Sequence, residues 1–320
     1  MMVFQESKTG QNMKYLMLSA AALALTACGN GDGSSSYEEP ADAKSSENAA
    51  DDVASDASGE KLSAILDAQS EETKARYQYR HPKETLEFLG IEPGMTVVDT
   101  LPGSVWYAGI LSEYLGPEGR VIGAAFSLEM RMAIGGRYAS EEWQSENANW
   151  PTTWTDEREA DREEGEAPFS GFFYGSMPDE FAGTADVVMV VRAAHHLNRI
   201  EEGRYFDIAL SDINKILKPG GVIGVIQHRA PEEASDEWAV GNNGYVKQSQ
   251  IIAKIENAGF ELVEISEINA NPNDQPSESD KVWRLPPTLG VNKADEDLVA
   301  QMQAIGESDR MTLKFRKPLE

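Results

Sequence analysis

The stretch LSDINKILKPGGVIGVIQHR, residues 210–229, decides the fold of this chain. It opens with an amphipathic run, which predicts a helix, and Pro219-Gly220-Gly221 then breaks that helix. The apolar run 222–226 follows and predicts a buried strand. His228 and Arg229 come directly after this run, at the carboxyl end of the predicted strand. In open α/β sheets, ligands bind at the carboxyl ends of the strands. The stretch therefore predicts one helix–strand unit of an α/β sheet with polar residues at its tip.

Similar apolar runs, bounded by turn residues, recur along the chain. Strands are predicted over residues 95–101, 121–126, 169–174, 185–191, 222–227, 260–268 and 311–315. Continuous apolar runs suit parallel strands that are covered on both faces, and the helical segments between them imply right-handed crossovers. The predicted fold is α/β, a three-layer, doubly wound, mostly parallel seven-stranded sheet. An acidic stretch at about 137–168 lacks clear periodicity and is interpreted as helical fragments plus a surface insertion.

The N-terminal segment carries a targeting pattern. The apolar run 15–27 is too short to cross a hydrocarbon core of about 30 Å at about 1.5 Å per residue, so residues 1–28 are interpreted as a signal peptide. LTAC, which ends at Cys28, resembles the lipobox of bacterial lipoproteins, in which the cysteine carries the acyl chains. Residues 29–60 hold nine acidic residues and one lysine with few apolar side chains, which predicts a disordered tether. Residues 61–320 are the predicted folded domain.

Composition limits the partners. The net charge is −26, which opposes nucleic-acid binding because phosphate contacts need clustered Lys and Arg. Cys28 is the one cysteine of the chain, so no internal disulfide can form. The expected partners are a small-molecule substrate and a membrane, reached through the lipid anchor at Cys28. The lipobox resemblance, with Gly29 after the cysteine, implies the bacterial cell envelope, at the outer membrane facing the periplasm.

Four segments together resemble class I S-adenosylmethionine-dependent methyltransferases, and more narrowly an exported subgroup of predicted bacterial methyltransferases. They are RYQYRHPKETLEFLGIEPGMTVVD (76–99), PGSVWYAGIL (102–111), LKPGGVIGVIQHRA (217–230) and the tail AGFELVEISEINANPND with DRMTLKFRKP. The resemblance implies S-adenosylmethionine as cofactor and methyl transfer to an unknown small molecule. It places Asp99, Gly103 and Ser104 in a glycine-rich cofactor turn, and Ala125, Phe126 and Ser127 at the strand tip beside the cofactor's ribose.

Two positions depart from that pattern. Val105 stands where another glycine is expected, and no carboxylate stands at the strand tip, although Glu129 follows shortly after. Losing a charged acceptor for the ribose hydroxyls costs on the order of 1.5–3 kcal/mol, roughly ten- to a hundredfold in affinity. The alternative is therefore a ligand-binding lipoprotein on a methyltransferase-like scaffold that no longer transfers methyl groups.

Of the four histidines, His195, His196 and His228 follow predicted strands, whereas His81 lies in the segment before the first strand, and all four are expected to converge on one crevice. They could supply a general base, ligate a metal or merely cap the strands. Two adjacent histidines on a strand point to opposite faces, which is a poor metal motif, so no metal site is predicted. The predicted catalytic residues are His195, His196 and His228. The predicted substrate-binding residues are Tyr79, Arg80, His81, Arg192 and Arg229, with ion pairing as the alternative role for Arg80 and for Arg310.

Overall fold

The computed structural model describes residues 45–103 and 105–320, with side chains from residue 57 onward. The predicted signal peptide, Cys28, the tether as far as residue 44 and Ser104 lie outside the described residues. Helix α1 runs from Ser45 to Ala68, so the predicted boundary between tether and domain at residue 60 falls inside a helix. Among the described residues, no helix has the length and apolar character needed to span a bilayer.

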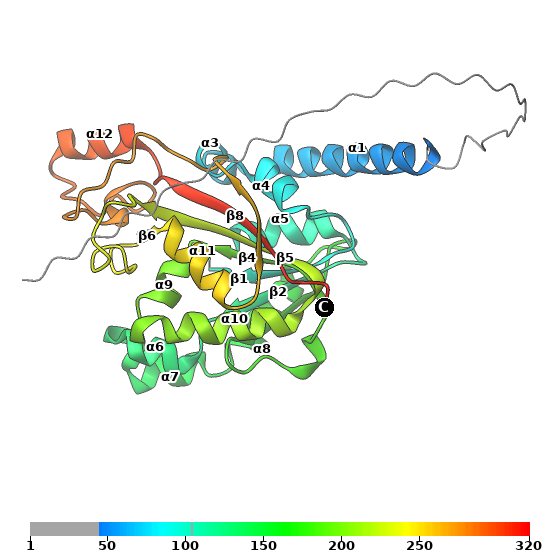
Figure 1. Ribbon diagram of the computed structural model, residues 1–320, viewed down its shortest axis with the longest axis horizontal. Helices are drawn as coiled ribbons and strands as arrows, with labels where there is room; N and C mark the ends of the chain where they lie inside the picture. The colour runs from blue at the N-terminus through cyan, green and yellow to red at the C-terminus, as the bar shows by residue number, and fades with distance from the viewer. Residues whose placement is uncertain (1–44, 104) are drawn as a thin grey trace, which may run out of the picture. The chain divides into compact units, whose positions relative to one another are not determined.

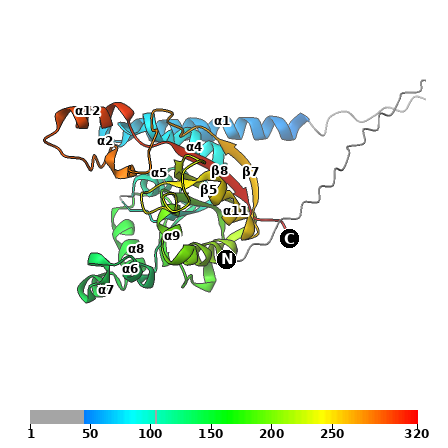
Figure 2. The ribbon, with the colours of Figure 1, turned by 60° about the vertical axis from the view of Figure 1, so that its left-hand side comes forward.

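The centre of the structure is a twisted sheet, shown in Figures 1 and 2. In the described residues its main path has the order β3-β2-β1-β4-β5-β8-β7, and the short β6 pairs with the far end of β5. Strands β1 to β5 are parallel, whereas β8 is antiparallel to both of its neighbours. The predicted doubly wound, mostly parallel sheet is thus confirmed. The strands are β1 (Thr96–Thr100), β2 (Arg120–Ala125), β3 (Phe169–Phe173), β4 (Ala185–Val191), β5 (Leu217–Ala230), β6 (Val246–Lys247), β7 (Glu261–Ser266) and β8 (Arg310–Arg316).

Helices cover both faces of the sheet, because successive side chains of each buried strand point to opposite sides. Val98 and Val188 face a core shared with α9, α10 and α11, whereas Val97 and Val187 face a second core shared with α1, α4, α5 and α8. Figure 1 shows α10 and α11 on one side of the sheet and α4 and α5 on the other. These helices and the others that follow α1 have the bounds α2 (Glu71–Lys74), α3 (Tyr77–Arg80), α4 (Pro82–Leu89), α5 (Trp106–Leu115), α6 (Leu128–Ile134), α7 (Glu141–Asn147), α8 (Trp150–Asp161), α9 (Ala194–Asn198), α10 (Arg204–Ile216), α11 (Gln248–Asn257) and α12 (Glu296–Ile305).

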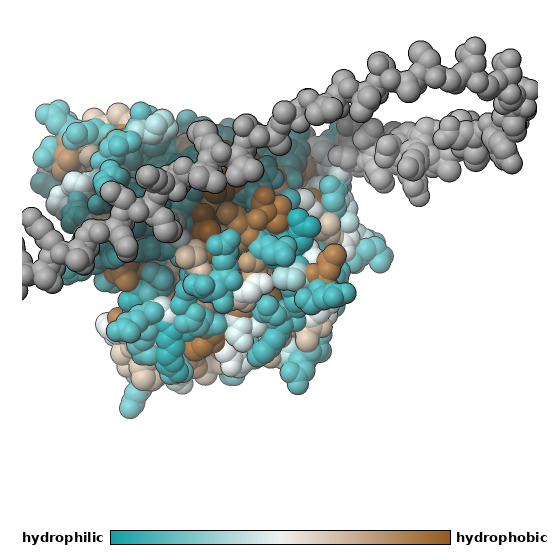
Figure 3. Space-filling view, in the orientation of Figure 1, coloured by the Kyte–Doolittle hydropathy of each residue, from teal (hydrophilic) through white to brown (hydrophobic). Residues whose placement is uncertain are grey.

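The acidic stretch 137–168 is mostly helical, since it contains α7 and α8. Helix α8 is anchored by Trp154, which packs edge-on against Phe169 of β3 with ring centroids 5.6 Å apart. The space-filling view of Figure 3 shows a largely hydrophilic face with a small apolar patch near its middle. Exposed large apolar side chains are few in the described residues; Val263 and Ile265 of the edge strand β7 are two of them.

The stretch 210–229 differs from its prediction in one respect. Helix α10 ends at Ile216 and β5 begins at the next residue, so Pro219-Gly220-Gly221 lies inside the extended segment. Lys317 Nζ donates to the carbonyls of Asn214 and Leu217, at 2.6 and 2.8 Å, and so satisfies backbone groups at the helix end. His228 also lies within β5 rather than beyond it, because β8 pairs with β5 as far as His228 opposite Arg310.

The strand order reverses between β1 and β4. These two strands are neighbours in the sheet, with Val98 opposite Val188. From β1 the chain continues to β2 on one side, and from β4 it continues to β5 on the other. In open α/β sheets the crevice outside the carboxyl ends of two such strands is where ligands bind. The fold therefore points to the residues that follow Thr100 and Val191.

Candidate functional site

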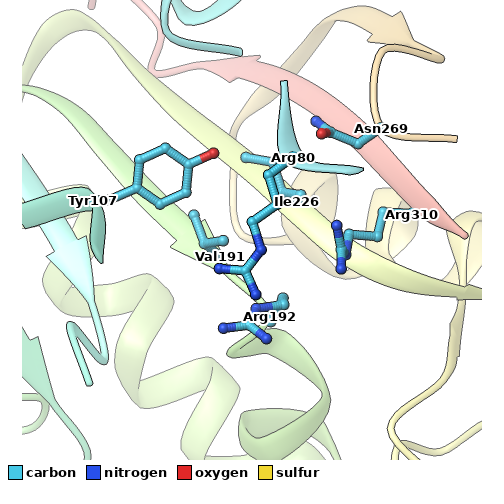
Figure 4. Close-up of a pocket in the computed structure, with 7 residues that line it drawn as sticks. All are labelled: Arg80, Tyr107, Val191, Arg192, Ile226, Asn269 and Arg310. Carbon is cyan, nitrogen blue, oxygen red and sulfur yellow. The ribbon is translucent and has the colours of Figure 1, made fainter. Parts of the chain in front are cut away.

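Two adjoining hollows lie at the carboxyl ends of β1 and β4. The switch-point hollow has a volume of about 370 Å³ and is lined by Arg80, Asp99, Leu101, Pro102, Gly103, Trp106, Tyr107, Val191 and Arg192. The arginine hollow has about 220 Å³ and extends toward β5 and β8. Figure 4 shows its lining side chains, which are Arg80, Tyr107, Val191, Arg192, Ile226, Asn269 and Arg310.

The backbone around the switch-point hollow is strained. Leu101, Val105 and Arg192 have φ of 58°, 55° and 52°, in the left-handed region that non-glycine residues rarely adopt, and Gly103 has φ of 48°. Such strain persists where surrounding structure imposes it. Leu101 N–H donates to the Ala124 carbonyl at 2.7 Å, and Arg192 N–H donates to the Ile226 carbonyl at 2.7 Å. Residues held this way concentrate at binding sites, which favours a functional role for this edge.

Asp99 and Arg192 bring opposite charges to this edge without forming an ion pair. Asp99 is 4% exposed, and burial raises the pKa of its carboxyl to about 7, although Arg192 lowers it. Burial likewise lowers the pKa of Arg192 to about 9, helped by the nearby charges of Arg80 and Arg310. Between residues 57 and 320, Ser104 aside, no carboxylate lies within ion-pair distance of Arg192. Among these described residues its guanidinium is therefore a free donor at the hollow.

One carboxylate serves three arginines beside the arginine hollow. Arg76 Nε and Arg80 Nε each donate to Glu307 at 3.1 Å, and Arg310 donates to the same carboxylate. Burial alone would raise the pKa of Glu307, but Arg310, Arg80 and Arg76 lower it to about 2. Burial lowers the pKa of Arg80 to about 10. The Glu307 carboxylate raises this pKa, whereas the positive charges of Arg310 and Arg76 lower it further. A single carboxylate thus leaves this cluster with an excess of positive charge.

Three of the four histidines gather. His195 and His196 lie on helix α9, not on a strand, and their ring centroids are 3.9 Å apart. The prediction that they point to opposite faces was therefore wrong, because the chain turns into a helix directly after Ala193. His228 lies 5.6 Å from His195 between ring centroids. His195 Nδ1 is 3.2 Å from Gln227 Oε1, and His228 Nδ1 is 2.5 Å from Ser308 Oγ.

The protonation of these rings bears on the catalytic prediction. Burial lowers the pKa of His195 to about 4, that of His196 to about 2, and that of His228 well below its usual value. A general base works best with a pKa near the working pH, and these rings are neutral but weak bases. They are also not among the side chains that line the two hollows. Their catalytic role stays a prediction, and the contacts seen here are packing and hydrogen bonding.

The predicted cofactor residues divide into two groups. Asp99 and Gly103 line the switch-point hollow, whereas Ala125, Phe126 and Ser127 are not among its lining residues. Phe126 is buried, with its ring 5.9 Å from that of His196. Ser127 Oγ accepts from Met130 N–H at 3.1 Å and so caps α6.

The position expected for the ribose carboxylate is filled differently. Glu129 has a side chain that is 64% exposed, and it pairs with Arg204 Nη1 at 2.9 Å. The tip of β2 therefore offers an aromatic ring and a capping hydroxyl where the resemblance implies a carboxylate.

The predicted substrate residues are also divided. Arg80 and Arg192 line both hollows. Tyr79 and His81 line a third, polar hollow of about 540 Å³, together with Asn271 and Ser308. Arg229 lines neither of the first two, since it pairs with Asp309 at 2.8 Å and with Glu267 at 2.7 Å. Of the four histidines expected to meet in one crevice, three lie close together but line neither of the first two hollows, and His81 shows no ring contact with them in the described part of the chain.

Sequence reasoning missed three residues of this edge: Tyr107, Asn269 and Glu307. Tyr107 could have been noticed as an aromatic residue at the start of the helix that follows the cofactor turn. Asn269 lies in INANPND, a run of polar turn residues directly after a strand. Glu307 carries no local signal, because its arginine partners Arg76 and Arg80 lie more than 200 positions earlier.

Comparison with known proteins gives matches among solved structures. No family model matches the chain, and no curated protein matches it. The crystal structure of the [4+2]-cyclase SpnF is 17% identical, covers 75% of this chain and 81% of its own, and has a TM-score of 0.45. A SAM-dependent methyltransferase from Aquifex aeolicus is 15% identical, with 65% and 93% coverage and a TM-score of 0.41.

A third similar structure is the geranyl diphosphate C-methyltransferase of Streptomyces coelicolor A3(2), solved with Mg²⁺, geranyl diphosphate and S-adenosyl-L-homocysteine. It is 13% identical, with 79% and 87% coverage and a TM-score of 0.45. Because all three TM-scores are below 0.5, the function of this chain has to be inferred from its own residues.

Proposed function

We propose that this chain is an S-adenosylmethionine-dependent methyltransferase that acts on a small molecule in the bacterial cell envelope. The observation that carries the proposal is the switch-point hollow. It lies where β1 and β4 diverge, and its wall is the strained turn that follows β1. The same turn carries Asp99 and Gly103, the two residues that best match the cofactor turn of the family that the sequence resembles.

The residues of the hollow fit this cofactor in three respects. Asp99 is a buried carboxyl that can accept a hydrogen bond from an ammonium group. Helix α5 begins at Trp106 without a side-chain cap, so its first N–H groups are available to a ligand. Trp106 and Tyr107 supply apolar surface against which a ligand can pack. When bound, S-adenosylmethionine supplies the reactive methyl group, while the chain positions it and keeps water out.

Calorimetric titration of the full chain with S-adenosylmethionine and S-adenosylhomocysteine tests the proposal. Saturation in the micromolar range supports it. Asp99→Asn is expected to weaken binding, because it removes the carboxylate while keeping the shape of the side chain. Glu129→Gln is the matched control, since Glu129 pairs with Arg204 outside the hollow, and its affinity should equal that of the wild type. Equal affinity in Asp99→Asn would contradict the assignment of Asp99.

The second candidate is a ligand-binding lipoprotein that transfers no methyl group. It is favoured by the tip of β2, where Phe126 and Ser127 stand in place of a ribose-binding carboxylate. Absence of heat at millimolar cofactor would support this candidate. Methyl transfer from radiolabelled cofactor into an envelope extract would contradict it.

We also propose that Cys28 carries the lipid anchor. The support is the LTAC pattern and the apolar run before it. Metabolic labelling with a radioactive fatty acid should label the wild type and not Cys28→Ser. Labelling of the variant, or recovery of the unmodified wild type, would contradict the anchor.

A further inference from the structure

We infer that the arginine hollow binds an anionic group of the substrate, a carboxylate or a phosphate, held between Arg192 and Arg80 with Arg310 as a third cation. The inference rests on the proposed function and adds the chemical class of the substrate. Figure 4 shows the guanidinium groups of Arg80 and Arg192 lying toward each other in this hollow. Two like charges facing each other in a partly buried space repel, and an anion between them removes that cost.

The local charge balance calls for such an anion. The described chain from residue 57 places four arginines at or beside this hollow, namely Arg76, Arg80, Arg192 and Arg310, and three of them share the single carboxylate of Glu307. This excess of cations stands in a protein whose net charge is −26. Buried charges are ordinarily paired, so an unbalanced group of guanidinium ions is costly to maintain without a ligand.

Unused hydrogen-bond donors point the same way. Arg80 Nη2 and Arg310 Nε are buried and have no partner in the described part of the chain. Arg192 makes no ion pair there, and its side chain opens into both hollows. Guanidinium groups bind carboxylate and phosphate through two parallel hydrogen bonds, which a single free arginine can provide. Tyr107 also lines the hollow, although its hydroxyl is hydrogen-bonded with Thr85.

The position of the hollow assigns the anion to the substrate rather than to the cofactor. Of these two hollows, Asp99 and Gly103 line only the switch-point hollow, whereas Ile226, Asn269 and Arg310 line only the arginine hollow. The arginine hollow therefore continues from the cofactor side toward β5 and β8.

Binding of inorganic phosphate and of acetate to the full chain tests the inference. Thermal unfolding and calorimetry are measured with and without saturating S-adenosylhomocysteine. We expect at least one anion to bind saturably in both conditions and to raise the unfolding temperature. Arg192→Gln should weaken that binding at least about tenfold, because it removes a charged hydrogen-bond pair. Arg192→Lys should retain part of it, and the relative affinities for phosphate and acetate tell which group the site prefers.

Arg120→Gln is the control, since Arg120 is an exposed residue at the start of β2 and its loss changes the net charge equally. Equal anion binding in the wild type and in a folded Arg192→Gln, as judged by near-ultraviolet circular dichroism, would overturn the inference. Competition between phosphate and S-adenosylhomocysteine would overturn it too, because the arginines would then hold the cofactor's carboxylate. If the cofactor binds and neither anion does, the inference falls while the proposed function stands. If an anion binds through Arg192 and the cofactor does not, the assignment to a methyl acceptor falls together with the proposed function.

Discussion

Arg80 and Glu307 form a buried ion pair, with Nε 3.1 Å from Oε2, that ties helix α3 to the turn before β8. The two residues are 227 positions apart in the sequence. Because Glu307 also pairs with Arg76 and Arg310, this one carboxylate fixes the wall of the arginine hollow. The pair therefore links the stability of the domain to the shape of its candidate site.

Glu307→Gln is expected to destabilise the protein by about 3–5 kcal/mol, because it leaves two buried guanidinium groups, Arg80 and Arg310, and the partly buried one of Arg76 without their carboxylate. Urea unfolding at neutral pH measures the change. Glu267→Gln is the control, since Glu267 pairs with Arg229 but has a side chain that is 60% exposed, and its loss should cost no more than about 1 kcal/mol. Equal losses in the two variants would contradict the central role of Glu307.

Stability should fall as the pH drops below about 6.5, the usual pKa of an unfolded histidine. Burial holds the pKa of His195 near 4 and that of His196 near 2, so between these values and 6.5 the unfolded chain binds protons that the folded chain does not. By linkage, the free energy of unfolding then increases as the pH rises across this window, and it decreases as the pH falls. His196→Phe should reduce that slope by up to about 1.4 kcal/mol per pH unit. An unchanged slope would show that His196 is protonated in the folded state.

Asp99→Asn should stabilise the protein at alkaline pH and weaken cofactor binding. Burial raises the pKa of Asp99 to about 7, above the roughly 3.9 of an unfolded aspartate, so the folded state keeps a proton that the unfolded state loses. The stability contributed by this proton is lost as the pH rises from about 4 to 7. Thermal unfolding of both proteins near pH 4 and near pH 8 should therefore show a gain for the variant only at the higher pH. A higher unfolding temperature for the variant at both pH values would mean that burial of the Asp99 charge is not the cause of the stabilisation.

Gly241→Ala should destabilise the protein by more than about 2 kcal/mol, because Gly241 has φ of 112° and an added Cβ would lie 2.5 Å from the carbonyl oxygen of His195. The clash would displace helix α9 and with it the histidine cluster. Gly109→Ala is the matched control: Gly109 lies inside α5, a Cβ added there would meet nothing within 4 Å, and alanine should add roughly 0.5–1 kcal/mol. Urea unfolding of both variants checks the contrast, and a stable Gly241→Ala would contradict it.

Much of the sheet could be predicted from the sequence because its strands are buried on both faces. The run 185–191 was predicted with the bounds that the structure gives to β4, and 121–126 differs from β2 by one residue at each end. The prediction was less accurate for 210–229, where Gly220 and Gly221 predicted a turn before the strand but β5 already begins at Leu217. Pairing with β8 along most of β5 decides that strand, and such pairing is a long-range contact that no local pattern contains.

The candidate site was predicted only in part, for a related reason. Asp99, Gly103 and Arg192 were predicted because they stand at strand ends or in a recognisable turn, and Arg80 because the family resemblance places its segment over this edge; all four line the switch-point hollow. Glu307 was missed because its role depends on contacts with arginines far away in the sequence. Arg229 was expected to face the substrate, but Asp309 and Glu267 take its guanidinium.

The sequence by itself determined how buried strands and helices alternate along the chain and which residue types follow each strand. Both depend on hydrophobic runs and turn residues that lie close together in the chain. The tertiary structure alone decided which charges are paired and which are free. Glu307 pairs with Arg76 and Arg80 from a distant segment and with the nearby Arg310, and Arg192 makes no ion pair among the described residues. Ion pairing depends on distances of a few ångströms between side chains hundreds of positions apart, and only the folded chain sets those distances.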